Sequence, residues 1–79
     1  MLNENKYKNA VASVAASVML EENNCEDAVN GIAYEAYQAM NGETPMYLMD
    51  VDEMDKLLGE ARAYVKANCD GYGFEWEEF

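Results

Sequence analysis

Two short interruptions divide the apolar pattern of this 79-residue chain into three segments, each with the period of a helix. The first interruption is Asn23-Asn24 and the second is Asn41-Gly42. Asparagine is favoured at helix N-caps, and glycine is favoured just after the end of a helix. The interruptions therefore predict a mainly α fold, a compact three-helix domain that takes up residues 1–79 as one unit.

The first two segments indicate helices that approach each other. In the first segment, apolar side chains spaced by four, three and four residues share one face: Tyr7, Val11, Val14 and Val18. In the second, the expected N-cap is Asn24, and the apolar stripe consists of Val29, Ile32, Ala36 and Met40. Gly31 costs about 1 kcal/mol relative to alanine inside a helix. It therefore marks either a close contact between helices or a weak point.

The third segment has the clearest start signal. Asp50 is placed as a cap, and Glu53 occupies the capping-box position three residues later. The apolar residues that follow fit a heptad seam: Val51, Met54, Leu58, Ala61 and Val65. The pattern predicts a third helix with Lys66 in its last turn.

The C-terminal segment changes to a period of two. Its larger side chains alternate with glycine or glutamate, in the manner of a strand: Tyr72, Phe74 and Trp76. Upstream, Met46–Met49 is either a short strand or a first helical turn. If it is a strand, Pro45–Met49 and Tyr72–Glu77 form a small two-stranded ribbon. We expect the tail aromatics to face the core and the tail glutamates to face solvent.

The methionines and two central tyrosines are expected to serve packing. Methionine is a flexible gap-filler in apolar cores. The core candidates are Met19, Met40, Met46, Met49 and Met54. Tyr34 and Tyr37 are expected at the edge of the core, although tyrosine also suits interfaces.

Charge is the strongest indication of function. The chain has 16 acidic and 5 basic residues, which gives a formal net charge of −11. Such a chain repels phosphate, so direct binding of nucleic acid and of anionic membranes is disfavoured. A basic surface on another macromolecule is the expected counterpart.

Catalysis, metal binding and membrane insertion are not favoured. The chain has no histidine, and Cys25 and Cys69 have no adjacent base. A twelve-residue loop that begins at Asp50 departs from an EF-hand at its fifth, sixth and twelfth positions, which are Met54, Asp55 and Ala61. The uncharged stretch Asn9–Leu20 is too short to span a bilayer, which needs about 20 residues. We expect no enzymatic activity and no cofactor. The cysteines are expected to be reduced thiols in the cytoplasm, with one bridge between them as the alternative.

Several acidic residues have no local structural reason. Helix capping and the helix dipole account for others, such as Glu26 and Asp27. The unexplained acids are Glu21, Glu22, Glu35, Glu43, Glu75, Glu77 and Glu78. With Asp52 and Asp55 on the third helix and Trp76 as an aromatic anchor, they form the predicted partner-binding set.

Small size, strong acidity, lack of catalytic groups and acidic stretches such as "YLMDVDEMDKLLGEARAY" resemble those of phage-encoded inhibitors. The similar group comprises the anti-CRISPR and anti-restriction DNA mimics, and the resemblance is one of composition over the whole chain. It implies a protein of the bacterial host cytoplasm that mimics nucleic-acid charge and inhibits a host defence complex, a nuclease or a polymerase. The alternative is a small helical homodimer with a structural or assembly role, in which the acids serve solubility.

Overall fold

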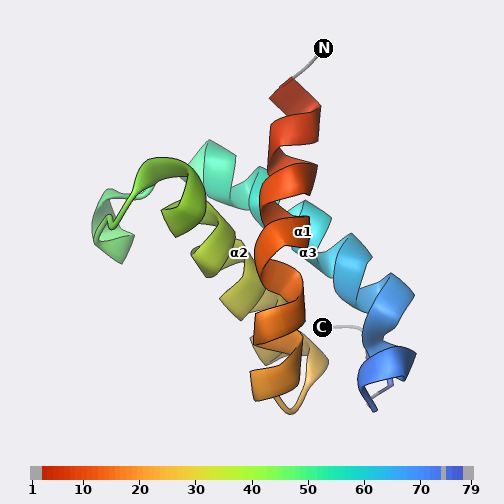
Figure 1. Ribbon diagram of the computed structural model, residues 1–79. Coiled ribbons are helices and arrows are strands. Elements are labelled where there is room, and N and C mark those ends of the chain that lie inside the picture. Colours follow the sequence, from red (N-terminus) through yellow and green to blue (C-terminus); the bar gives the residue numbers. More distant parts are fainter. Residues whose placement is uncertain (1–2, 74, 78–79) are drawn as a thin grey trace.

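The computed structural model describes residues 3–73 and 75–77, with side chains from Asn5 onward, and these residues form three α-helices (Figure 1). The helices are α1 (Asn3–Glu21), α2 (Cys25–Asn41) and α3 (Val51–Asn68). Two short 3-10 helices follow α2 and α3, namely η1 (Met46–Leu48) and η2 (Cys69–Tyr72). The described residues contain no strand. The predicted mainly α, three-helix fold is confirmed.

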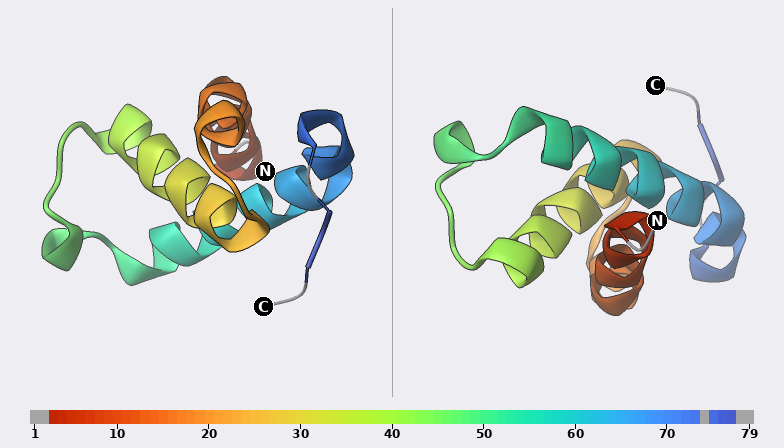
Figure 2. Two further views of the ribbon diagram at one scale, coloured as in Figure 1. Left: turned by 90° about the horizontal axis from the view of Figure 1, so that it is seen from below. Right: turned by 90° about the horizontal axis from the view of Figure 1, so that it is seen from above.

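The three helices meet at one crossing and separate at one end. All three pack against one another. Figure 2 shows α2 and α3 as the arms of a V, with α1 lying across them near the point where they approach. The segment that contains η1 joins the two arms at the wide end of the V. In the part of the chain that the structure describes, no helix is long and apolar enough to cross a membrane.

The core lies at the crossing. Its buried members come from all three helices and include Val11, Ala15, Met19, Val29, Ile32, Leu57, Ala61 and Val65. Small residues allow the helices to approach closely. A Cβ atom on Gly31 of α2 would lie 2.9 Å from Cγ1 of Val18 on α1. Gly31 therefore marks a close contact between helices rather than a weak point.

The predicted helix boundaries at Asn24, Gly42 and Asp50 are confirmed. The Asn24 side chain accepts a hydrogen bond from the Asp27 N–H at 2.9 Å. Gly42 ends α2 with φ of 76°, a backbone conformation that glycine adopts without a steric cost. The Asp50 carboxylate accepts from the N–H groups of Asp52 and Glu53 at 2.9 and 3.2 Å. These signals act within a few residues, which is why the sequence reveals them.

The heptad seam predicted for α3 is wrong in its first turn. Val51 is 79% exposed, whereas Leu57, which lies outside that seam, is fully buried. The buried stripe is Leu57, Ala61 and Val65, with Met54 and Leu58 half-buried beside it. A seam that starts at Val51 requires a neighbouring helix along all of α3. The first turn of α3 lies instead at the wide end, where α2 has diverged (Figure 2).

The possible two-stranded ribbon is not supported, and Met46–Leu48 forms a helical turn, which was the alternative. Pro45–Met49 forms a 3-10 turn, in which the Leu48 and Met49 N–H groups donate to the Pro45 and Met46 carbonyl oxygens at 2.9 and 3.2 Å. Those local bonds occupy the N–H groups that strand pairing requires. Tyr72 belongs to η2, so the proposed partner Tyr72–Glu77 does not begin as a strand either.

The C-terminal segment nevertheless folds back as expected where it is described. Trp76 is half-buried against the core, while Glu75 and Glu77 are exposed. The Cys25 thiol donates to the Glu75 carbonyl oxygen at 3.0 Å and so ties the segment to the start of α2. Phe74, to which the same prediction applied, lies outside the described residues.

Candidate interaction surface

The predicted partner-binding acids divide into two groups according to the elements that carry them. One group lies near the turn between α1 and α2: Glu21, Glu22, Glu75 and Glu77. The other is carried by α2, the connection after it and α3: Glu35, Glu43, Asp52 and Asp55. All of these side chains are exposed except Glu22, which is half-buried. Glu78 lies outside the described residues.

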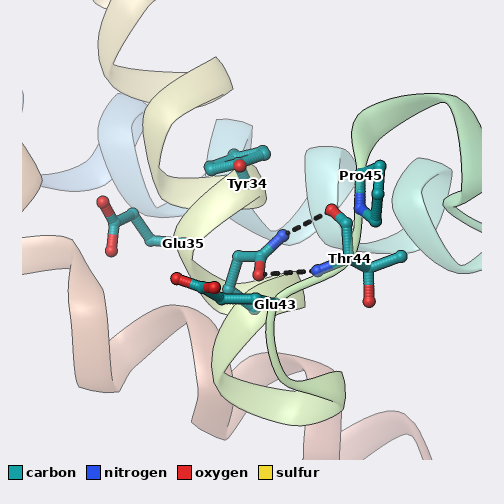
Figure 3. Close-up of a pocket in the computed structure, with 6 residues that line it drawn as sticks. Tyr34, Glu35, Glu43, Thr44 and Pro45 are labelled. Carbon is teal, nitrogen blue, oxygen red and sulfur yellow. Dashed lines mark hydrogen bonds between the residues drawn. The ribbon is translucent and has the colours of Figure 1, made fainter.

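Glu35 and Glu43 face the same hollow, which has a volume of about 600 Å³ (Figure 3). Its other lining residues are Tyr34, Gln38, Thr44 and Pro45. The Gln38 amide donates to the Thr44 carbonyl oxygen and accepts from the Thr44 N–H, both at 3.0 Å. This pair of bonds fixes the connection after α2 against the helix, and with it the Glu43 backbone.

Next to this hollow lies an apolar groove of about 470 Å³ between α2, η1 and α3. We call it the methionine groove. Its apolar and aromatic lining residues are Tyr34, Met46, Met49, Val51, Met54 and Leu58, and its polar ones are Asn30 and Asp55. Tyr34 lines both the groove and the hollow of Glu35 and Glu43, so the two adjoin at this side chain.

The apolar surface here is well exposed. Met46 is 69% exposed, and the neighbouring Tyr47 and Leu48 are 85% and 63% exposed. The prediction that the methionines fill the core is therefore wrong for Met46, whereas Met19 is buried as expected. Large contiguous apolar patches are rare on monomers and commonly mark binding sites. The sequence signal was the apolar run "MYLM" directly after a proline, in a segment too short to bury it.

Acidic side chains lie at both ends of the groove. Glu35 and Glu43 lie in the adjoining hollow at one end. At the other, the groove continues past Asp55 into a hollow of about 510 Å³ that Glu26 and Arg62 also line. Two of the remaining bases lie elsewhere, since the Lys6 and Lys56 ammonium groups lie 5.3 and 5.6 Å from the centre of the Tyr7 ring. The groove is thus apolar in its middle and mainly acidic around it.

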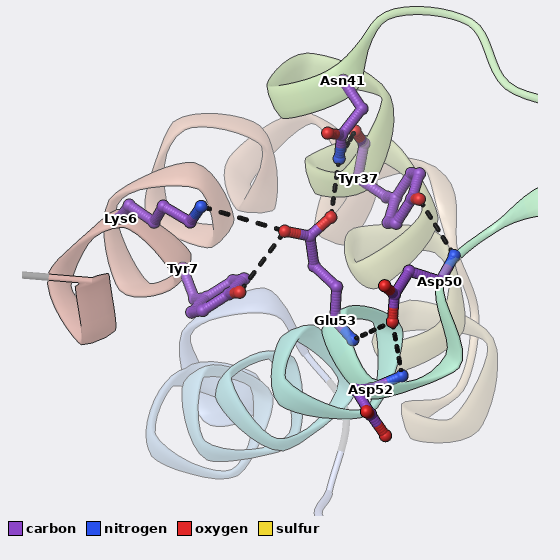
Figure 4. A network of polar contacts seen from close by, with 7 residues as sticks. All are labelled: Lys6, Tyr7, Tyr37, Asn41, Asp50, Asp52 and Glu53. Carbon is purple, nitrogen blue, oxygen red and sulfur yellow. Dashed lines mark hydrogen bonds and ion pairs between the residues drawn. The ribbon is translucent and has the colours of Figure 1, made fainter.

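A polar network fixes the start of α3 beside the groove (Figure 4). The buried Tyr37 hydroxyl accepts from the Asp50 N–H at 3.0 Å. That N–H is the group that the Glu53 carboxylate would take in a full capping box. Glu53 instead accepts from Asn41 at 2.9 Å and from the Tyr7 hydroxyl at 3.3 Å. One side chain, predicted only as a cap, thereby links all three helices.

The network also changes the pKa of the Tyr7 hydroxyl. Partial burial, and then the negative charge of Glu53, raise the pKa of the Tyr7 hydroxyl. The Lys6 ammonium group lies 3.9 Å from the same carboxylate. Protonated Tyr7 is therefore the form that the fold favours.

The two cysteines belong to the core. Cys25 and Cys69 are free and buried. Burial, followed by the neighbouring Cys25, raises the pKa of the Cys69 thiol, which makes it a weaker nucleophile at neutral pH. Within residues 3–73 and 75–77, no three histidine, cysteine or carboxylate side chains are placed to hold a metal ion.

Comparison of the chain with models of protein families, with curated proteins and with solved structures gave no match.

Proposed function

We propose that the protein is a non-catalytic inhibitor that binds a basic, nucleic-acid-binding protein or nucleoprotein complex of bacterial defence or transcription. Its acidic side chains take the place of nucleic-acid charge on that target. The observation that carries the proposal is the surface around the methionine groove, where carboxylates surround an exposed apolar centre. Met49, Met54 and Leu58 of the groove also pack against the core, whereas Met46 and Val51 lie outside the core cluster.

The acids suit this role by their position. None of the described charged side chains is buried, so their field extends into solvent. Asp52 and Asp55 are exposed and three residues apart on α3, a spacing that separates Cβ atoms by about 5–6 Å. Rows of this kind present repeated negative charge, as a nucleic-acid strand does. Complementary fields then accelerate the encounter with a basic target.

Affinity capture from a bacterial lysate tests the proposal. The immobilised protein should retain a nucleic-acid-binding protein at low salt, release it as ionic strength rises, and lose it to added duplex DNA. The double variant Asp52→Lys/Asp55→Lys should abolish retention. Glu75→Lys/Glu77→Lys makes the same charge change on the C-terminal segment, outside the lining of the groove and its two adjoining hollows, and should have a smaller effect. Retention that duplex DNA does not reduce would contradict charge mimicry.

The second candidate is a homodimer with a structural role. The exposure of Met46, Tyr47 and Leu48 favours it, because a copy of the chain could cover them. Sedimentation velocity separates the two. A dimer that persists from low to high salt supports the structural role, whereas a monomer throughout supports the inhibitor.

A further inference from the structure

We propose that the methionine groove binds an amphipathic α-helix of the target, one that carries Lys or Arg beside its apolar stripe. The inference rests on the proposed function and specifies the element of the partner that is recognised. The charged surface then accelerates association, and the groove supplies the apolar contacts.

The lining of the groove suits a helix. An amphipathic helix presents its anchors at positions i, i+3 or i+4, and i+7, as a row that fits a groove between two other helices. Three of the lining residues are methionines, Met46, Met49 and Met54. Their unbranched, polarizable side chains adapt to different anchor shapes. The aromatic ring of Tyr34 lies at the boundary with the acidic hollow and is a suitable hot-spot residue.

Charge determines which helix fits. The groove is bounded by Glu35 and Glu43 in one hollow and by Glu26 and Asp55 in the other, with Arg62 as a basic residue of that second hollow. A second copy of the chain would bring a net charge of −11 against −11. Like charges across an interface disfavour association. A basic partner gains from the same carboxylates, so we assign the groove to a basic helix rather than to self-association.

The groove is held in shape before any partner arrives. The two Gln38–Thr44 hydrogen bonds fix the start of the connecting segment against α2. The Tyr37–Asp50 bond fixes the end of that segment, where α3 begins. The segment between them, which contains η1, is therefore anchored on both sides. Association loses less conformational entropy when the binding surface is already ordered.

The test uses three synthetic peptides of about 15 residues, a length at which a binding surface can stabilise a helix. The first carries a leucine stripe at helical spacing with lysines elsewhere. The second has the same composition in an order that destroys the stripe. The third keeps the stripe and replaces lysine with glutamate. Fluorescence anisotropy should give the tightest binding for the first peptide and at least about tenfold weaker binding for each of the others.

Matched variants locate the site. Met46→Lys should weaken binding of the first peptide by at least about tenfold. Leu20→Lys, on α1 and outside the groove lining, replaces a similarly exposed apolar side chain (77%) and should leave binding nearly unchanged. Asp55→Asn and Glu21→Gln form a second pair, in which only the first should weaken binding. Thermal melting checks that each variant is folded.

Several outcomes would overturn the inference. Equal losses for Met46→Lys and Leu20→Lys would mean that only net charge is sensed. Equal affinity for the first and second peptides would exclude helix recognition. Self-association that Met46→Lys disrupts would assign the groove to a second copy.

The proposed function can fail separately. If the peptides and variants behave as expected but lysate capture yields no nucleic-acid-binding protein, the groove assignment stands and the inhibitor proposal falls. If duplex DNA competes with a captured basic protein whose retention Met46→Lys leaves unchanged, the proposed function stands and the groove assignment falls.

Discussion

The crossing of the three helices and the wide end of the V use similar side chains in opposite ways. At the crossing, Met19 is 2% exposed, whereas Met46 at the wide end is 69% exposed. Alanines and Gly31 let the helices approach at the crossing, so apolar area is removed from water there. At the wide end, hydrogen bonds at Thr44 and Asp50 hold the backbone of the segment that carries exposed apolar side chains. Stability explains the first region, and binding is the better explanation of the second.

The two regions should differ most in the free energy of unfolding that is lost when an apolar side chain is replaced by alanine. Leu57→Ala at the crossing removes a fully buried side chain and should lower the free energy of unfolding by about 2–5 kcal/mol. Met46→Ala should change it by less than about 0.5 kcal/mol. Urea denaturation followed by circular dichroism measures both. A comparable loss for Met46→Ala would show that the wide end is part of the core.

The C-terminal segment should behave as part of the crossing. Trp76 is half-buried against the core, so Trp76→Ala should cost about 1–2 kcal/mol. Truncation after Gly71 should cost at least as much. Tyr47→Ala, at 85% exposure, is the matched aromatic control at the wide end and should be nearly neutral. An unchanged melting temperature for the truncated protein would refute this role.

Alanine substitutions at two glycines inside helices should change the stability of the protein in opposite directions. A Cβ atom on Gly59 of α3 would meet nothing within 4 Å beyond its own helix, so Gly59→Ala should stabilise the protein by about 0.5–1 kcal/mol. Gly31→Ala gains the same helix propensity but pushes a Cβ to 2.9 Å from the stiff Val18 side chain. We expect it to destabilise by about 1 kcal/mol. Melting curves that rise for both variants would mean that α1 and α2 are less tightly packed.

The smallest expected effect is on how the stability of the protein changes at alkaline pH. The folded pKa of Tyr7 is raised, so its contribution is complete below the unfolded pKa of about 10 and is lost as pH rises through the folded value. The stability of the protein should therefore fall above about pH 10, and Tyr7→Phe should make that fall shallower. Denaturation curves at increasing alkaline pH measure the slope. Identical slopes would contradict the coupling of Tyr7 to Glu53.

The fold was predictable where the signals are local. Asn24, Gly42 and Asp50 define helix ends through contacts within a few residues, and all three predictions hold. The covered face of α3 was not predictable from its own period, because it depends on the angle at which α2 diverges. Glu53 shows the same limit. Its position predicts a cap, but its carboxylate bonds to Tyr7, 46 residues away in sequence.

The candidate site was predictable only in part. Charge identified Glu35, Glu43 and Asp55, which the structure places in two adjoining hollows that share Tyr34. It did not distinguish them from Glu21 and Glu75, because the sequence does not tell which acids share a face. The apolar centre was missed, since methionine suits a core as well as a groove. Only the tertiary arrangement leaves Met46 without a covering helix.

Methyl NMR of the methionine-labelled protein tests the central claim most directly. Titration with the lysine-rich amphipathic peptide should shift the methyl signals of Met46, Met49 and Met54, which line the groove. The signals of Met19 in the core and Met40 at its edge should stay in place. Shifts confined to Met46, Met49 and Met54 would establish the wide end as the binding surface. Binding that leaves these three signals unmoved would contradict the account.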